Sequence, residues 1–86
     1  MKIIKFQAVW CSACLVMKKT WKEIKELYPD LDVTEYDYDL DEDEVVKYNI
    51  DDKLPVIIML DDNGKELKRL VGEKNKEEVL SFIKER

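Results

Sequence analysis

Two cysteines separated by two residues constrain this chain more than any other feature of its sequence. Cys11 and Cys14, in the stretch V-W-C-S-A-C-L, are the only cysteines, and there is no histidine. Residues 2–8 before them are rich in β-formers, whereas from Ser12 onward apolar residues recur at steps of three and four. The cysteine pair is therefore predicted to lie where a β-strand runs into an amphipathic helix.

The number of possible metal ligands and the spacing of the cysteines distinguish among the kinds of site that use such a pair. A structural zinc site takes four cysteine or histidine ligands, so we expect no metal site and no bound cofactor. A disulfide between Cys11 and Cys14 would close too short a loop to stabilise the fold appreciably. A redox-active dithiol is the interpretation we favour. The alternative is a non-catalytic binding module, whose dithiol holds a soft metal such as Cu(I) or docks a partner.

The predicted position at a helix N-terminus suits a redox-active centre. Unpaired N–H groups and the helix macrodipole stabilise negative charge there, which favours a thiolate on Cys11. Cys14 lies about one turn further along the same helix face, within disulfide-bonding range. We therefore expect the Cys11 sulfur to point outward and attack, with Cys14 behind it to resolve.

The middle of the chain predicts a second strand and a short helix. Residues 33–38 alternate apolar and polar side chains, as a half-buried strand does. The helix that follows carries Val45 and Val46, and Asp41 or Asp43 is predicted to cap it. The first long helix is expected to stop at Pro29.

The last third of the chain predicts a β-hairpin and a final helix. Asn63-Gly64 is a strong turn signal between apolar runs at 56–60 and 66–71. Asn75 with Glu78 has the spacing of an N-terminal capping pair. The predicted order is β-α-β-α-β-β-α over one domain, residues 1–86.

Composition and charge limit the classes of partner and the cellular compartment that we expect. The net charge of −5 argues against a general nucleic-acid or anionic-membrane surface. No apolar run reaches the roughly 20 residues of a membrane span, and the N-terminus lacks the pattern of a secretory signal. We expect a cytoplasmic monomer. Four lysines early in the predicted first helix (18, 19, 22 and 25) form a solvated face that could steer an acidic partner.

The sequence resembles the thioredoxin superfamily. The resemblance is carried by Trp10-Cys11-x-x-Cys14 after a strand, Leu54-Pro55-Val56 before the hairpin, and Gly72 near the end of the last strand. It covers the chain in a shortened, glutaredoxin-sized form. The implied fold is the minimal thioredoxin fold, an α/β architecture with a four-stranded mixed sheet and helices on both faces.

The resemblance implies a thiol:disulfide oxidoreductase that reduces protein disulfides and takes part in electron transport. Cys11 would attack, Cys14 would resolve, and a thioredoxin-reductase-type donor would return the electrons. The substrate-binding surface would comprise six residues, with Pro55 in the cis conformation: Trp10, Ser12, Ala13, Leu54, Pro55 and Gly72. The Ser12 hydroxyl could donate to the Cys11 thiolate. Gly72 is followed by Glu73 instead of the second glycine of glutaredoxins, which argues against glutathione dependence.

One departure concerns the charges beneath the predicted dithiol. Thioredoxins carry a buried acid six residues before the first cysteine and a lysine on the neighbouring strand. Lys5 and Glu35 occupy those positions here, so the two charges are exchanged. One interpretation is a surface ion pair across the strands. In the other, Glu35 accepts the proton of Cys14, directly or through water, while Lys5 keeps the carboxylate ionised and favours thiolate.

Overall fold

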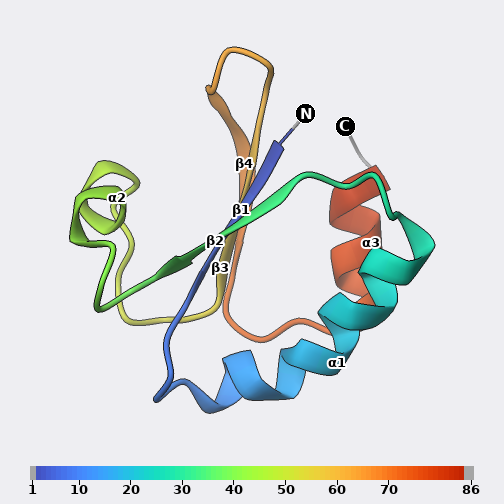
Figure 1. Ribbon diagram of the computed structural model, residues 1–86, viewed down its shortest axis with the longest axis horizontal. Coiled ribbons are helices and arrows are strands. Elements are labelled where there is room, and N and C mark those ends of the chain that lie inside the picture. The colour runs from blue at the N-terminus through green and yellow to red at the C-terminus, as the bar shows by residue number, and fades with distance from the viewer. Residues whose placement is uncertain (1, 85–86) are drawn as a thin grey trace.

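The computed structural model describes residues 2–84 as seven elements in the predicted order. The strands are β1 (Lys2–Gln7), β2 (Val33–Asp37), β3 (Val56–Leu60) and β4 (Glu66–Val71). The helices are α1 (Ser12–Leu27), α2 (Glu42–Lys47) and α3 (Lys76–Lys84). Figure 1 shows the sheet edge-on, with α1 and α3 on one side and α2 on the other.

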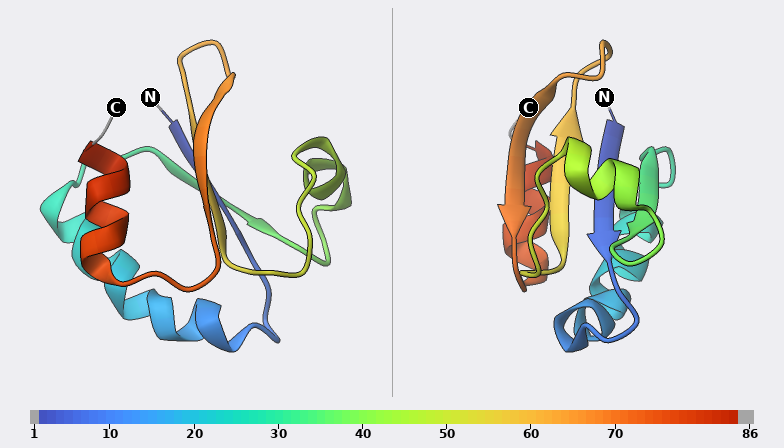
Figure 2. Two further views of the ribbon diagram at one scale, coloured as in Figure 1. Left: turned by 180° about the vertical axis from the view of Figure 1, so that it is seen from behind. Right: turned by 90° about the vertical axis from the view of Figure 1, so that its left-hand side faces the viewer.

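The four strands form one mixed sheet in the order β2-β1-β3-β4. β1 is parallel to β2, whereas β3 runs antiparallel to both β1 and β4. β2 and β4 are therefore the edge strands, as the turned view in Figure 2 shows. This is the α/β architecture expected of a minimal thioredoxin fold.

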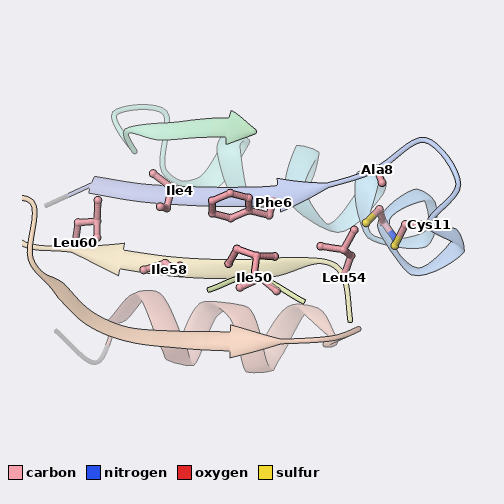
Figure 3. Packing of buried hydrophobic residues seen from close by; sticks show 10 residues of the cluster. Ile4, Phe6, Ala8, Cys11, Ile50, Leu54, Ile58 and Leu60 are labelled. Atoms are coloured by element: carbon pink, nitrogen blue, oxygen red, sulfur yellow. The ribbon is translucent and has the colours of Figure 1, made fainter. Parts of the chain in front are cut away.

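Each face of the sheet carries its own hydrophobic core, because successive side chains of a strand point to opposite faces. Ile4 and Phe6 of β1 pack toward α2, with the cluster drawn in Figure 3. Ile3 packs in the other cluster, with Met17 and Trp21 of α1. The fully buried β3, which reads V-I-I-M-L, contributes to both clusters.

Local signals explain where the helices begin and end. α1 starts at Ser12, and its last residue, Leu27, lies two residues before Pro29, which cannot continue it. At α3, the Asn75 side-chain oxygen accepts a hydrogen bond from the Glu78 backbone N–H at 2.8 Å, as the capping pair predicted. None of the helices within residues 2–84 has the length and apolar character to cross a membrane.

The predicted cap of α2 is wrong in its chemistry. Asp41 occupies the N-cap position, but its side chain makes no capping hydrogen bond. Its carboxylate instead accepts from the backbone N–H of Asp37, at 2.7 Å, and so closes the loop that leads into the helix. Asp43 lies inside the first turn of the helix. An aspartate in such a loop has several backbone donors within reach, so spacing alone does not choose among them.

Candidate functional site

The dithiol lies at one end of the sheet, where β1 runs into α1. Cys11 is the N-cap of α1, and its sulfur accepts a hydrogen bond from the Cys14 backbone N–H at 3.1 Å. Its own backbone N–H donates to the carbonyl of Ala8 at 3.2 Å, which tightens the turn out of β1. Both cysteines are free thiols. A donor aimed at the sulfur stabilises negative charge on it.

The Cys11 sulfur is less accessible than expected. Cys11 is 6% exposed and Cys14 is 8% exposed, so the outward presentation predicted for Cys11 is wrong. The reason is tertiary: Ala8 and Leu54 belong to the same buried cluster as the dithiol, and Figure 3 shows Leu54 at the end of the sheet nearest Cys11. Little of either cysteine is therefore open to solvent.

The two cysteines differ in their environments. Burial raises the pKa of the Cys14 thiol from 9.0 to about 11, with a further contribution from its hydrogen bond to Cys11. The Lys5 ammonium acts in the opposite direction, because a positive charge favours the thiolate. Cys14 is therefore a protonated thiol at neutral pH. It must lose that proton before it can act as a nucleophile.

A loop from the opposite side of the sheet completes the site. The Leu54–Pro55 peptide bond is cis, the isomer that the resemblance implied. The Pro55 carbonyl accepts a hydrogen bond from the Gly72 backbone N–H at 2.9 Å. Gly72 has a φ of +88°, a conformation that suits glycine. Gly72 thus holds the end of β4 against the loop that carries Leu54.

Exposed apolar side chains flank the two cysteines along the chain. Val9 is 84% exposed, Trp10 53%, Leu15 55% and Val16 61%. Ser12 is exposed and Ala13 half-buried. No hydrogen bond from the Ser12 hydroxyl to Cys11 is found among the described residues, where the Cys14 backbone N–H is the donor instead. Such an apolar rim around a reactive group is typical of a surface that meets another protein.

Trp10 has partners that the sequence did not indicate. Its indole N–H donates to an Asp39 carboxylate oxygen at 2.8 Å, and its ring meets the Tyr38 ring edge-on at 5.9 Å. These contacts join the loop before α1 to the loop after β2. The acidic run at 37–44 was the available signal, but composition does not say which acid faces an indole. Asp39 thus belongs to the site by position, since it fixes Trp10 beside the dithiol.

Lys5 and Glu35 pair across the parallel strands β1 and β2, in direct register. The Lys5 Nζ lies 3.1 Å from Glu35 Oε1. The pair is asymmetric, because the Lys5 side chain is 9% exposed and that of Glu35 is 55% exposed. Lys5 Nζ also lies 4.9 Å from the centroid of the Trp21 ring, an arrangement that stabilises a buried cation.

The exposed carboxylate of this pair remains ionised. Partial burial acts to raise the pKa of Glu35, but the hydrogen bond and charge of Lys5 outweigh it, so that the pKa lies below its ordinary value. A hydrogen bond from Gln7 Nε2 at 3.1 Å contributes in the same direction. The pair is thus neither a fully exposed surface ion pair nor a buried one.

The site offers no metal centre of the usual kind. Within residues 2–84, no three side chains of the ligating types Cys, His, Asp and Glu are grouped closely enough to hold a metal ion. The chemistry available at the site is that of two thiols, one at a helix N-terminus and one protonated behind it. They are positioned to form a disulfide by exchange with another one.

Comparison with known proteins identifies the family to which the chain belongs. The thioredoxin family model matches residues 1–85. The chain belongs to the thioredoxin family. A reduced thioredoxin pre-protein from Schistosoma mansoni is 32% identical, with a TM-score of 0.84 over 95% of this chain and 74% of that one. No match was found among curated proteins.

Other thioredoxin structures agree with this assignment. Thioredoxin-2 of the malaria parasite, described as a component of its protein secretion machinery, is 25% identical, with a TM-score of 0.87 over 98% of this chain and 81% of that one. Thioredoxin 1 of Thermosipho africanus is 26% identical, with a TM-score of 0.81 over 96% of this chain and 90% of that one. Thioredoxin-fold proteins of this kind are thiol-disulfide oxidoreductases, with a redox-type cysteine pair where Cys11 and Cys14 lie.

Proposed function

We propose that this protein reduces disulfide bonds in other proteins through a dithiol–disulfide cycle. The observation that carries the proposal is the difference between the two thiols: Cys11 accepts a hydrogen bond at the start of α1, whereas Cys14 is buried and protonated. Such a pair divides attack and resolution between two sulfurs. The family assignment supports the same reaction.

The cycle has two exchange steps. The Cys11 thiolate attacks one sulfur of the substrate disulfide, forms a mixed disulfide and releases the other substrate sulfur as a thiolate. Cys14 then loses its proton and attacks Cys11, which forms the Cys11–Cys14 disulfide and releases the reduced substrate. An external donor of two electrons, of the thioredoxin-reductase type, restores the dithiol. No bound cofactor takes part in these steps.

Substrate docking uses the apolar rim and the cis-proline loop. Trp10, fixed by Asp39, offers a flat apolar surface next to Cys11. Leu54, on the other side, presents its backbone to an extended substrate segment beside the dithiol, and Gly72 holds that loop in position. Ser12 and Ala13, at the first turn of α1, lie under the substrate sulfur as it arrives.

Proton transfer during resolution is assigned to Glu35, through water. Lys5 supports this transfer in two ways. Its ammonium favours the Cys14 thiolate, and its ion pair keeps Glu35 ionised. The lowered pKa of Glu35 makes it a weak base, so its contribution is smaller than that of a base matched to neutral pH.

The protein is expected to act as a monomer in a reducing compartment, the cytoplasm. A reducing compartment fits this cycle because the dithiol must be regenerated after every turnover. The deciding experiment measures reduction of a model protein disulfide, with thioredoxin reductase or glutathione as the electron source. We expect multiple turnovers with the reductase and little with glutathione. Absence of turnover with both donors, together with stoichiometric Cu(I) binding by the dithiol, would instead establish a binding module.

A further inference from the structure

A hollow of about 370 Å³ lies between α1 and the strands β1 and β2, and neither cysteine lines it. Its lining includes Lys5 and Glu35 and three further lysines of α1, Lys18, Lys22 and Lys25. Lys5 is compensated by its ion pair with Glu35. The hollow is therefore a positively charged feature on a protein whose net charge is −5.

The three lysines of the hollow are available for a partner. They are exposed, and in the described part of the chain the side chains of Lys18 and Lys22 make no hydrogen bond or ion pair. Lys25 acts on Glu35 only through its charge. Three ammonium groups on one helix face repel each other, and an anionic partner relieves that repulsion.

These lysines are aligned with the dithiol. At about 100° per residue, Cys14, Lys18, Lys22 and Lys25 fall within an arc of about 80° on α1. At about 1.5 Å per residue, the lysines begin about 10 Å beyond the level of Cys11 and extend over about another 10 Å. A ligand that covers the row therefore points toward the end of the helix where the reaction takes place.

The length of the row favours an extended segment over a compact anion. A single phosphate group contacts only part of a row about 10 Å long. Alternate side chains of an extended peptide recur about every 7 Å, so two successive acidic side chains span most of a row about 10 Å long. The residues at 40–44, by contrast, line an acidic hollow that would repel the same ligand. Repulsion elsewhere would orient an acidic partner toward α1.

We propose that the lysine row of α1 is a docking site for an extended acidic segment of the partner proteins whose disulfides the dithiol reduces. The inference rests on the proposed function for the reaction, but not for the binding. Docking there would raise the rate of encounter with acidic partners and hold their disulfide near Cys11. The site would thus select among substrates by charge, whereas the apolar rim selects by shape.

The first test measures binding without any redox chemistry. A fluorescent, cysteine-free peptide with glutamate at alternate positions is titrated into the reduced protein, with a glutamine version as its control. Two triple variants of equal net charge are compared: Lys18→Gln, Lys22→Gln, Lys25→Gln in the row, and Lys47→Gln, Lys65→Gln, Lys84→Gln at exposed sites outside α1. We expect salt-sensitive binding that the row variant loses and the control variant keeps.

The second test measures selectivity in the reaction. Two disulfide peptides, one flanked by glutamates and one by glutamines, are reduced by wild type and by both variants. We expect the wild type to prefer the acidic peptide by about tenfold at low salt, the row variant to prefer neither, and the control variant to behave as wild type. If neither peptide is reduced, the proposed function fails, and the binding test alone decides the docking site.

The same measurements distinguish other possible ligands of the lysine row. Equal loss of binding in both triple variants would overturn the proposal, because net charge alone would then explain the effect. Displacement of the peptide by low concentrations of tripolyphosphate, with tighter binding than the peptide shows, would assign the hollow to a small polyanion. Self-association of the wild type that only the row variant abolishes would assign it to a second copy of the chain. Either result would overturn the acidic segment.

Discussion

Cys11 and Cys14 are chemically different groups although only two residues separate them. Cys11 accepts a backbone hydrogen bond at the start of a helix, whereas Cys14 is a buried thiol whose pKa is raised to about 11. The consequence is a fixed order of events. In the proposed cycle the first sulfur attacks the substrate, and the second must be deprotonated before it resolves the mixed disulfide.

This order predicts the behaviour of two serine variants. Cys14→Ser keeps the attacking sulfur but cannot resolve, so it should accumulate a mixed disulfide with a protein substrate. Cys11→Ser removes the nucleophile and should accumulate none at pH 7, since Cys14 remains protonated there. Intact mass spectrometry of reaction mixtures, without reductant, measures both. Equal trapping by the two variants would contradict the assignment of roles.

The exchanged ion pair makes a second prediction at this scale. Glu35→Gln should slow resolution of the mixed disulfide by about tenfold at neutral pH, well below the roughly 10²–10⁴ contributed by a well-matched base. The initial attack should change less, because only resolution removes a proton from Cys14. Rapid-quench kinetics of the two steps measures the difference.

Controls for the ion pair are available in the chain. Glu23→Gln removes a carboxylate that pairs with Lys76 at 3.5 Å elsewhere on α1, and should leave both steps unchanged. The double change Lys5→Asp with Glu35→Lys restores the charge arrangement usual in thioredoxins and should recover much of the lost rate. If Glu35→Gln resolves as fast as wild type across the pH range, the pair is structural only.

At the scale of elements, the order of strands and helices could be predicted because each one has a strong local signal. Asn63-Gly64 marks the hairpin, Pro29 follows the end of α1, and the periodicity of apolar residues changes after the cysteines. The observed bounds of β3, β4 and the start of α1 agree with those signals. Where the signal was an aspartate near a helix start, as at Asp41, the element was right and the contact was wrong.

The features that could not be predicted are set by contacts between distant segments. Cys11 is buried because Leu54, more than forty positions away in the chain, packs in the same cluster. Trp10 is fixed by Asp39, from a loop after another strand. Register placed Lys5 opposite Glu35, but it did not indicate that Trp21 of α1 packs against Lys5 and leaves the pair unequally exposed.

The cap of α3 gives a test of element stability. Asn75→Ala removes the acceptor for the Glu78 backbone N–H and should lower the free energy of unfolding by about 1 kcal/mol. Urea unfolding followed by circular dichroism measures it. Glu73→Ala, an exposed change two positions earlier and outside the helix, is the matched control and should alter stability by less than about 0.5 kcal/mol. Equal effects of the two changes would show that the cap contributes nothing specific.

At the scale of the whole molecule, the dithiol lies at one end of the sheet and the tip of the β3–β4 hairpin at the other (Figure 1). Charge is distributed unevenly too, with lysines along α1 and acids around the start of α2. The reactive end is therefore built from the β1–α1 junction and the loop before β3. Changes at the hairpin tip are not expected to reach it.

Burial of Cys14 couples the redox site to the stability of the whole fold. Because the folded chain raises the pKa of this thiol from 9.0 to about 11, it holds the proton more tightly than the unfolded chain does. The stability that this contributes is complete below pH 9 and is lost as the pH rises toward 11. The reduced protein should therefore lose stability in alkaline solution more steeply than a variant without this thiol.

The measurement is urea unfolding of the reduced wild type and of Cys14→Ala, in a phosphine reductant, at pH 8 and pH 10. Between these values the wild type should lose about 1 kcal/mol more than the variant, since unfolding releases most of this proton in the upper half of that range. Lysines and tyrosines that titrate nearby are common to both proteins, so their effects cancel in the comparison. The oxidised protein has no Cys14 proton to release, so it should not show this alkaline loss. Parallel curves for reduced wild type and Cys14→Ala would mean that the folded and unfolded chains bind this proton equally. Protonated Cys14 would then no longer explain the order of the two exchange steps.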